Sequence, residues 1–222
     1  MQSLSYTEEN YLKAIYRLSD QGNKVSTNAL ADNMSTTPAS VNDMLKRLSQ
    51  KDLINHVKYK GATISSSGKK AALKVIRKHR LWEVFLVETL GFKWDEVHEI
   101  AEQLEHIKSP LLVERLDQFL DHPTMDPHGD PIPDKNGNFN VGPSRPLSEL
   151  KVNEKGVLTS VGNDDPKLLQ YLDKIRIRLG SKILVKDIVE FDNSFEIETD
   201  DNRSLFLSNQ IATLLLISKT TT

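Results

Sequence analysis

Residues 36–50, TTPASVNDMLKRLSQ, decide the fold of the first part of the chain. Pro38 opens a helix here, at a position where the N–H that proline lacks would have no partner in any case. Residues 25–33, VSTNALADN, predict a short preceding helix with Ser26 near its cap, and the polar turn MSTTP joins the two. Two short helices joined by a tight turn, the second basic towards its end, predict a helix-turn-helix.

The flanking segments extend this unit to a winged helix. Residues 5–19, SYTEENYLKAIYRLS, have the apolar spacing of an amphipathic helix, with Thr7 as the expected N-cap. Residues 53–59 and 62–65 have strand composition, and Lys60-Gly61 between them predicts a hairpin turn. Segment 41–80 carries 11 Lys+Arg against 2 Asp+Glu, which is the charge that DNA docking requires. A winged helix used for protein contacts is the alternative.

In this docking the third helix enters the major groove and the wing approaches the phosphates. The residues expected to reach base edges are Thr37, Pro38, Ala39, Ser40, Asn42 and Asp43. Those expected to contact phosphate, where they position the protein without specifying sequence, are Lys46, Arg47, Lys58 and Lys60.

The net charge of −2 conceals an asymmetry along the 222 residues. Residues 1–80 hold 14 Lys+Arg and 6 Asp+Glu, whereas residues 81–130 hold 3 and 12, which suggests a polyanion partner for the first and a cation for the second. Cysteine is absent, so disulfides and thiolate ligands are excluded. There is no apolar run of 18 residues and no signal-peptide pattern, so we expect a cytoplasmic protein without membrane contact.

The acidic middle contains the stretch Asp95–Ile107, DEVHEIAEQLEHI. At about 100° per residue, His98, Glu102, Glu105 and His106 would share one face of a helix. A solvated acidic face is one explanation. A metal site is the more specific explanation, because imidazole nitrogen and carboxylate oxygen together suit divalent transition metals.

Two further helices flank this stretch. A long helix from Ser67 stops near Gly91, and its strongly apolar second half has to be buried, in part on another subunit. His79 and Glu83 lie four residues apart on it and so share a face. Residues 109–119 predict another amphipathic helix, whose apolar face is the second candidate for the interface of a homodimer.

Residues 121–146 hold six of the nine prolines and mark a domain boundary. His122 and His128 lie there and are interpreted as loop histidines rather than ligands. Beyond this linker, short alternating strands predict a small barrel: GVLTSVG, KIRIRLG, KILVKDIVEF, SFEIETD, RSLFLS and TLLLIS, with LLQYLDK as one or two helical turns. We therefore expect a mainly α N-terminal part, made of a winged helix-turn-helix (1–66) and a helical metal-binding and dimerisation domain (67–121), then a proline-rich linker (122–146) and a small all-β SH3-like barrel (147–222).

Three stretches resemble the diphtheria-toxin-repressor (DtxR) family of metal-dependent transcriptional regulators, including its manganese-sensing MntR branch. They are YTEENYLKAIYRL with TTPASVNDMLKRL, HRLWE with DEVHEIAEQLEH, and DHPTMDPHGDPIP. The resemblance covers essentially the whole chain, and the C-terminal part is similar to the FeoA-like, SH3-like domain of long members. It implies a repressor that binds a palindromic operator as a homodimer when loaded with metal.

The resemblance also implies two neighbouring metal positions. One would use Glu102, Glu105 and His106 with a side chain near the start of the chain, where Asn10 stands in place of the usual ligand. The other would use His79, Glu83 and His98, completed from the small domain by Asp164 or Asp165. Lys13 falls where manganese-type members carry a carboxylate, which argues against a binuclear site of that kind.

Oxygen-rich ligation makes Mn(II) the expected metal, ahead of Fe(II), and Zn(II), Co(II), Ni(II) or Cd(II) can occupy such ligands in vitro. An enzyme is not expected, because the chain has neither the Glu-x-x-His motifs of ferritin-like enzymes nor the second histidine of a zincin. No small-molecule substrate is expected. The remaining alternative is a winged-helix regulator that responds to a non-metal ligand.

Overall fold

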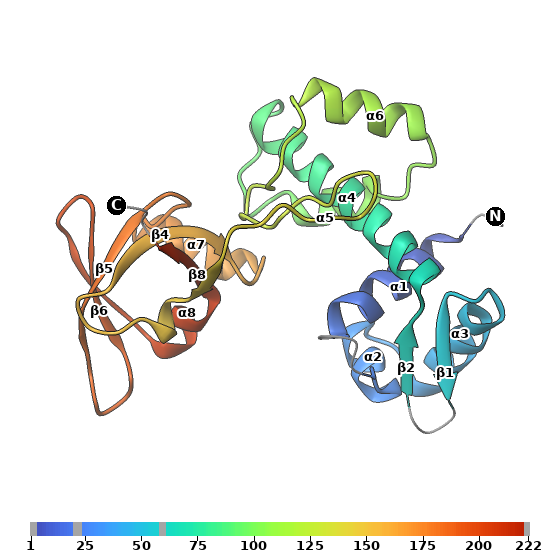
Figure 1. Cartoon of the computed structure of the whole chain (residues 1–222), viewed down its shortest axis with the longest axis horizontal. Helices are drawn as coiled ribbons and strands as arrows, with labels where there is room; N and C mark the ends of the chain where they lie inside the picture. The colour runs from blue at the N-terminus through green and yellow to red at the C-terminus, as the bar shows by residue number, and fades with distance from the viewer. Residues whose placement is uncertain (1–3, 20–23, 58–60, 220–222) are drawn as a thin grey trace. The chain divides into compact units, whose positions relative to one another are not determined.

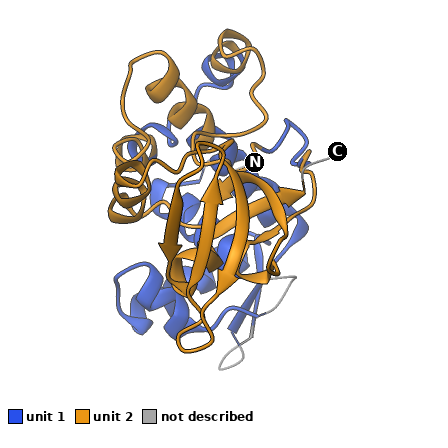
Figure 2. Cartoon of the chain, turned by 90° about the vertical axis from the view of Figure 1, so that its left-hand side faces the viewer, with its two compact units in different colours: residues 1–79, 102–114, 133–139 blue, residues 80–101, 115–132, 140–222 orange. Residues whose placement is uncertain are grey.

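The computed structural model describes residues 4–19, 24–57 and 61–219. A helical N-terminal region precedes an antiparallel β domain, which confirms the predicted fold class (Figure 1). The chain divides into two compact units, residues 1–79, 102–114 and 133–139 in one, and residues 80–101, 115–132 and 140–222 in the other (Figure 2). The boundary between His79 and Arg80 falls inside one continuous helix, α4. The four-part division expected from the sequence stays a prediction.

The first unit contains the winged helix. Helix α1 spans Tyr6–Leu18, α2 Thr27–Asn33 and α3 Pro38–Gln50, while strands β1 (Ile54–Val57) and β2 (Gly61–Ile64) pair antiparallel. Ser5, not Thr7, is the N-cap of α1, and it forms a capping box with Glu8. The second helix begins at Thr27 rather than Val25, because Val25 instead pairs with Ala62 in the wing. Pro38 lies in the first turn of α3, as predicted from the sequence, and Thr37 is the N-cap.

Three helices follow the wing. Helix α4 spans Ser66–Glu88, and the chain turns at Gly91 with φ +73°. Helix α5 covers only His98–Leu104, so the expected helix over 95–107 is shorter at both ends. Glu105 and His106 lie in the turn after α5, and the single four-residue helix face expected from the periodicity is therefore wrong. Helix α6 spans Pro110–Phe119. None of the helices in the described part of the chain is long and apolar enough to cross a membrane.

The proline-rich segment after α6 is held by its own turns and by contacts within the second unit. Met125 and Pro131 form an isolated β-bridge. The loop lies against strand β4 (Lys155–Val161), where the N–H of Val161 donates to the carbonyl of His128 at 2.9 Å. Gly129 has φ +82°, and a Cβ there would lie 2.0 Å from the carbonyl oxygen of Thr159, so only glycine fits.

The C-terminal domain is a six-stranded antiparallel sheet in the order β3-β8-β4-β5-β6-β7. Besides β4, its strands are β3 (Ser144–Pro146), β5 (Lys182–Ile188), β6 (Phe195–Thr199), β7 (Ser204–Leu207) and β8 (Leu215–Lys219). Helices α7 (Pro166–Lys174) and α8 (Asn209–Leu214) and the short η2 (Leu147–Glu149) supply part of its core. The segment KIRIRLG is a turn rather than the expected strand. Its alternation reflects Ile177 entering the core after α7 ends, with Arg176 at φ +58°.

Candidate metal centres and nucleic-acid interface

The residues predicted to reach DNA lie at the exposed start and outer face of α3. Thr37 through Ser40 are exposed, and the Thr37 side chain accepts a hydrogen bond from the N–H of Ser40 at 3.3 Å. Asn42 is half-buried, whereas Asp43, Lys46 and Arg47 are exposed. Lys46 pairs with Asp43 at 3.0 Å, an exposed pair worth little to stability. Lys58 and Lys60 lie outside the described residues.

One group of ligand-type side chains already contains a cation. We call Lys13, His79, Glu102 and Glu105 the Lys13 cluster, all of them within the first unit. The Lys13 Nζ lies 2.5 Å from Glu102 Oε1 and 2.6 Å from Glu105 Oε1. His79 Nδ1 lies 2.7 Å from Glu105 Oε2. These ligand atoms would otherwise be close enough to hold a metal, since those of His79, Glu102 and Glu105 lie within 4.8 Å of one another.

Glu105 is fully buried and contacts both Lys13 and His79 through its carboxylate oxygens. Burial acts to raise the pKa of Glu105, but the hydrogen bond from His79 and the charge of Lys13 outweigh it, so the pKa lies below its ordinary value. The group is therefore held as a carboxylate by its neighbours in the first unit.

His106, predicted as a ligand with Glu102 and Glu105, contacts other groups. Its Nδ1 lies 2.6 Å from Glu9 Oε2, and its ring stacks on Tyr6 with centroids 4.7 Å apart. Its Nε2 is 3.7 Å from Glu105 Oε1. Asn10, the predicted ligand from the start of the chain, is half-buried, and its Oδ1 makes no hydrogen bond to any described residue.

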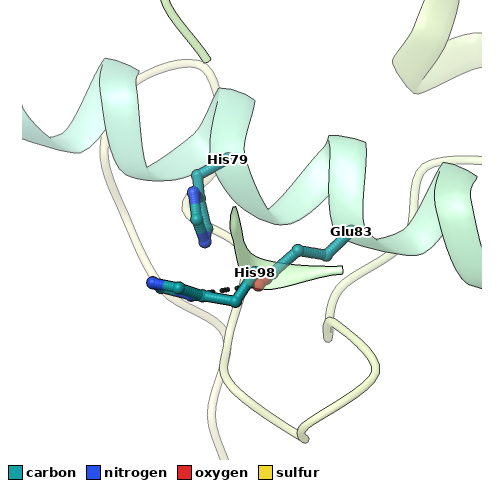
Figure 3. Close-up of side chains that lie close together, drawn as sticks. All are labelled: His79, Glu83 and His98. Atoms are coloured by element: carbon teal, nitrogen blue, oxygen red, sulfur yellow. Dashed lines mark ion pairs between the residues drawn. The ribbon is translucent and has the colours of Figure 1, made fainter. Parts of the chain in front are cut away.

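A second group lies in the second unit and gathers side chains from four segments. We call Glu83, His98, Asp126, His128 and Asp164 the Glu83 cluster. His98 Nδ1 lies 2.9 Å from Asp164 Oδ2 and 3.7 Å from Glu83 Oε1. His79 stands one turn before Glu83 on α4, and Figure 3 shows both residues with His98, their ligand atoms within 4.8 Å of one another.

His128 and Asp126 complete this cluster, and sequence reasoning missed both. The Nε2 of His128 lies 2.7 Å from the carbonyl oxygen of Trp94, a contact that fixes this nitrogen as the donor. In the neutral imidazole Nδ1 then carries the lone pair, and this nitrogen lies 3.9 Å from both Glu83 Oε1 and Asp126 Oδ1. His128 does lie in a loop, as interpreted, but it is buried. The alternation of acid and imidazole in DPHGD was the signal in the sequence.

Asp126 shows how much negative charge this cluster concentrates. Burial raises the pKa of Asp126 to about 7, and the charges of Glu83 and Asp130 add to this rise. Arg80 opposes it with its Nε 3.4 Å from Asp126 Oδ2, and His128 opposes it as well. A buried carboxylate facing others is stabilised by a cation, so the group is suited to hold one.

The small domain contributes Asp164 rather than Asp165 to the Glu83 cluster. Asp164 approaches His98, whereas Asp165 is exposed and caps helix α7 by accepting from the N–H of Lys167 at 2.8 Å. Of the two aspartates expected from the small domain, it is Asp164 that lies beside His98.

Three protein-family descriptions match successive parts of this chain. Residues 3–62 match the N-terminal DNA-binding domain of iron-dependent repressors, residues 65–134 match their metal-binding and dimerisation domain, and residues 145–219 match the FeoA domain. A solved manganese-dependent transcriptional repressor in complex with manganese is 34% identical, covers 96% of this chain and 100% of its own, and superimposes with a TM-score of 0.88. The chain belongs to the diphtheria-toxin-repressor family.

Other members of this family show the same likeness. The crystal structure of ScaR with bound Cd²⁺ is 35% identical with a TM-score of 0.81, covering 96% of this chain and 99% of that one. The iron-dependent repressor IdeR of Mycobacterium leprae is 33% identical over 133 residues, 60% of this chain and 58% of that protein. The diphtheria toxin repressor of Corynebacterium jeikeium is 29% identical over 162 residues, 72% of this chain and 68% of that protein.

Membership in the diphtheria-toxin-repressor family confirms the expected class of protein, a metal-dependent transcriptional repressor and not an enzyme. The matched DNA-binding and dimerisation domains imply operator DNA and a second copy of the chain as partners. The family's domain also implies a divalent metal, and both clusters contain ligand atoms within 4.8 Å of one another.

Proposed function

We propose that this chain is a manganese-responsive repressor that binds its operator as a homodimer in the cytoplasm, with the metal held by the Glu83 cluster. The observation that carries this proposal is the position of His128, buried in a loop with Nδ1 directed at Glu83 and Asp126. A backbone carbonyl holds its other nitrogen, which is how proteins commonly orient a metal-binding imidazole.

The donor set fits a divalent cation of intermediate hardness. It offers three carboxylates and two imidazoles and no thiolate, which suits Mn(II) and Fe(II) and also accepts Zn(II) or Cd(II). Manganese is favoured because the relative of TM-score 0.88 is a manganese-dependent repressor in complex with manganese. When bound, the cation would add positive charge among these carboxylates.

The residues of the Glu83 cluster come from parts of the chain that are far apart in sequence. Glu83 belongs to α4, His98 opens α5, and Asp126 and His128 belong to the loop after α6. Asp164 belongs to the C-terminal domain. Ligands from separate elements favour a single arrangement of those elements, so binding shifts the population towards that arrangement.

DNA binding is assigned to α3, and dimerisation to the apolar side of α6. The exposed residues Thr37–Ser40 and Lys46–Arg47 stand where a recognition helix contacts base edges and phosphates. On α6, Leu111, Leu112 and Phe119 are 62%, 39% and 65% exposed, and apolar side chains exposed together mark a surface for protein contact. A second copy of the chain would cover them.

The test is DNA binding with and without metal. Duplexes selected from a random pool by the manganese-loaded protein are titrated by fluorescence anisotropy in Mn(II) and in EDTA. We expect tight binding in Mn(II) and at least tenfold weaker binding in EDTA for the full chain. His128→Ala should abolish this difference. His122→Ala is the control and should retain it, because His122 is an exposed loop histidine that pairs with Asp117, outside the Glu83 cluster.

Two outcomes would contradict the proposal. Operator binding that is the same in Mn(II) and EDTA would favour a regulator that responds to a non-metal ligand. Retention of the full manganese response by His128→Ala would show that the Glu83 cluster is not the responsive site.

A further inference from the structure

We propose that the ammonium of Lys13 is the permanent cation of the Lys13 cluster, so that this cluster takes no divalent metal and helix α1 is held to residues 102–108 without one. The proposal concerns residues of the first unit only. It does not depend on whether the Glu83 cluster binds manganese.

The position of the Lys13 Nζ is that of a ligated cation. It lies within 2.6 Å of one oxygen from each of two carboxylates, Glu102 and Glu105. The side chain of Lys13 is 6% exposed and that of Glu105 is fully buried, so water screens the Lys13–Glu105 contact little. Charge-assisted hydrogen bonds of this kind are among the strongest that side chains make.

A divalent metal would have to displace this ammonium, because both need the same oxygens. A metal that joined the cluster with Lys13 in place would bring two cations together in a poorly screened site, which is unfavourable. The alternative place for the Lys13 side chain is the adjoining cavity of about 340 Å³. Arg17 lines that cavity together with Asn10, so the displaced ammonium would meet another positive charge there.

Neighbouring contacts keep helix α1 on the same segment without metal. Glu9, one turn before Lys13, lies 2.6 Å from His106. Lys108 donates from Nζ to the carbonyl of Leu4 at 2.8 Å. His106, the remaining ligand-type residue here, therefore has Nδ1 engaged by a carboxylate of α1. Residues of the chain itself therefore link helix α1 to residues 102–108.

The first experiment counts bound manganese by electron paramagnetic resonance of the full-length protein. Wild type should bind one Mn(II) per chain, Glu105→Gln should also bind one, and Glu83→Gln should bind none. Two equivalents in wild type with one lost in Glu105→Gln would overturn the Lys13 proposal. If wild type binds none, the proposed function of the Glu83 cluster fails, and the Lys13 proposal is decided by the second experiment.

The second experiment removes the built-in cation. In the Glu83→Gln background, Lys13→Met should gain one Mn(II) per chain and should show a melting temperature that rises when Mn(II) is added. Lys13→Arg is the matched control and should gain neither, because it keeps the positive charge. No gain in Lys13→Met, or an equal gain in Lys13→Arg, would overturn the proposal. Should Lys13→Met fail to fold, the comparison of wild type with Glu105→Gln decides.

Discussion

Gly129 is the position at which one added methyl group should separate the proline-rich loop from the C-terminal sheet. Alanine at φ +82° carries strain of about 1–2 kcal/mol. Its Cβ would also lie 2.0 Å from the carbonyl oxygen of Thr159, whereas ordinary van der Waals contact begins at 3.4 Å. Because the obstacle is backbone, we add about 1–3 kcal/mol for overpacking. Gly129→Ala should therefore lower the free energy of unfolding by about 2–5 kcal/mol.

Two other glycines of the chain separate these contributions. Gly91 has φ +73° with nothing within 4 Å of an added Cβ, so Gly91→Ala should cost only the conformational strain of about 1–2 kcal/mol. Gly142 has neither a positive φ nor a close neighbour, so Gly142→Ala should be neutral or stabilising by up to about 1 kcal/mol. We therefore expect the free energy of unfolding to be highest for Gly142→Ala, lower for Gly91→Ala and lowest for Gly129→Ala.

The assay is urea unfolding followed by tryptophan fluorescence. Trp94 packs against the core of the C-terminal domain and stacks on His128, so its emission reports on the loop as well as on the domain. Gly129→Ala should also weaken manganese binding, since it displaces the neighbouring His128. If Gly129→Ala unfolds at the same urea concentration as Gly142→Ala, the loop does not pack on β4 as described.

Three further changes test other elements. Glu8→Gln keeps a residue that can form the capping box of α1 but removes the carboxylate that pairs with Lys51 at 2.6 Å, so it should cost about 1 kcal/mol. Burial acts to raise the pKa of Glu8, but Lys51 and the hydrogen bonds of the cap outweigh it and lower the pKa. The stability is therefore present above the pKa of the unfolded chain, and the difference in melting temperature from wild type should vanish as pH falls through the lower folded pKa. Phe119→Glu should shift sedimentation towards the monomer, whereas Gln118→Glu, also exposed on α6, should not. Arg47→Ala should weaken operator binding about equally for all sequences and reduce the salt slope by about 1, measured by anisotropy at several salt concentrations.

The winged helix could be predicted because its signals are local. Pro38 and Ser26 fix the starts of two helices through backbone hydrogen bonding, and both were identified from the sequence. The strand assignment of KIRIRLG failed because a turn that directs Ile177 into the core produces the same alternation as a strand. Hydrophobic periodicity indicates which side chains are buried, but it does not determine the backbone conformation that buries them.

The candidate site was harder to predict because it depends on contacts between distant segments. The periodicity of residues 95–107 suggested one helix face, but α5 ends at Leu104. Glu105 lies in the turn that follows, and its carboxylate contacts Lys13 and His79. Likewise, the composition around His128 correctly predicts a loop, but the burial of that loop follows from its packing on β4. The local sequence shows the ligand-type residues, such as those of DPHGD, but not which distant segments they contact.

The two clusters differ in charge, and this difference determines which of them needs a metal. In the Lys13 cluster two carboxylates share one ammonium at hydrogen-bond distance, so their negative charge is largely matched within the chain. In the Glu83 cluster three carboxylates gather around two imidazoles, and the nearest guanidinium, Arg80, is shared with Asp130 at 2.7 Å. The carboxyl of Asp126 responds with a pKa raised to about 7, whereas that of Glu105 has a lowered pKa. Even with Arg80 beside it, Asp126 keeps a raised pKa, so a cation from solution gains most at the Glu83 cluster.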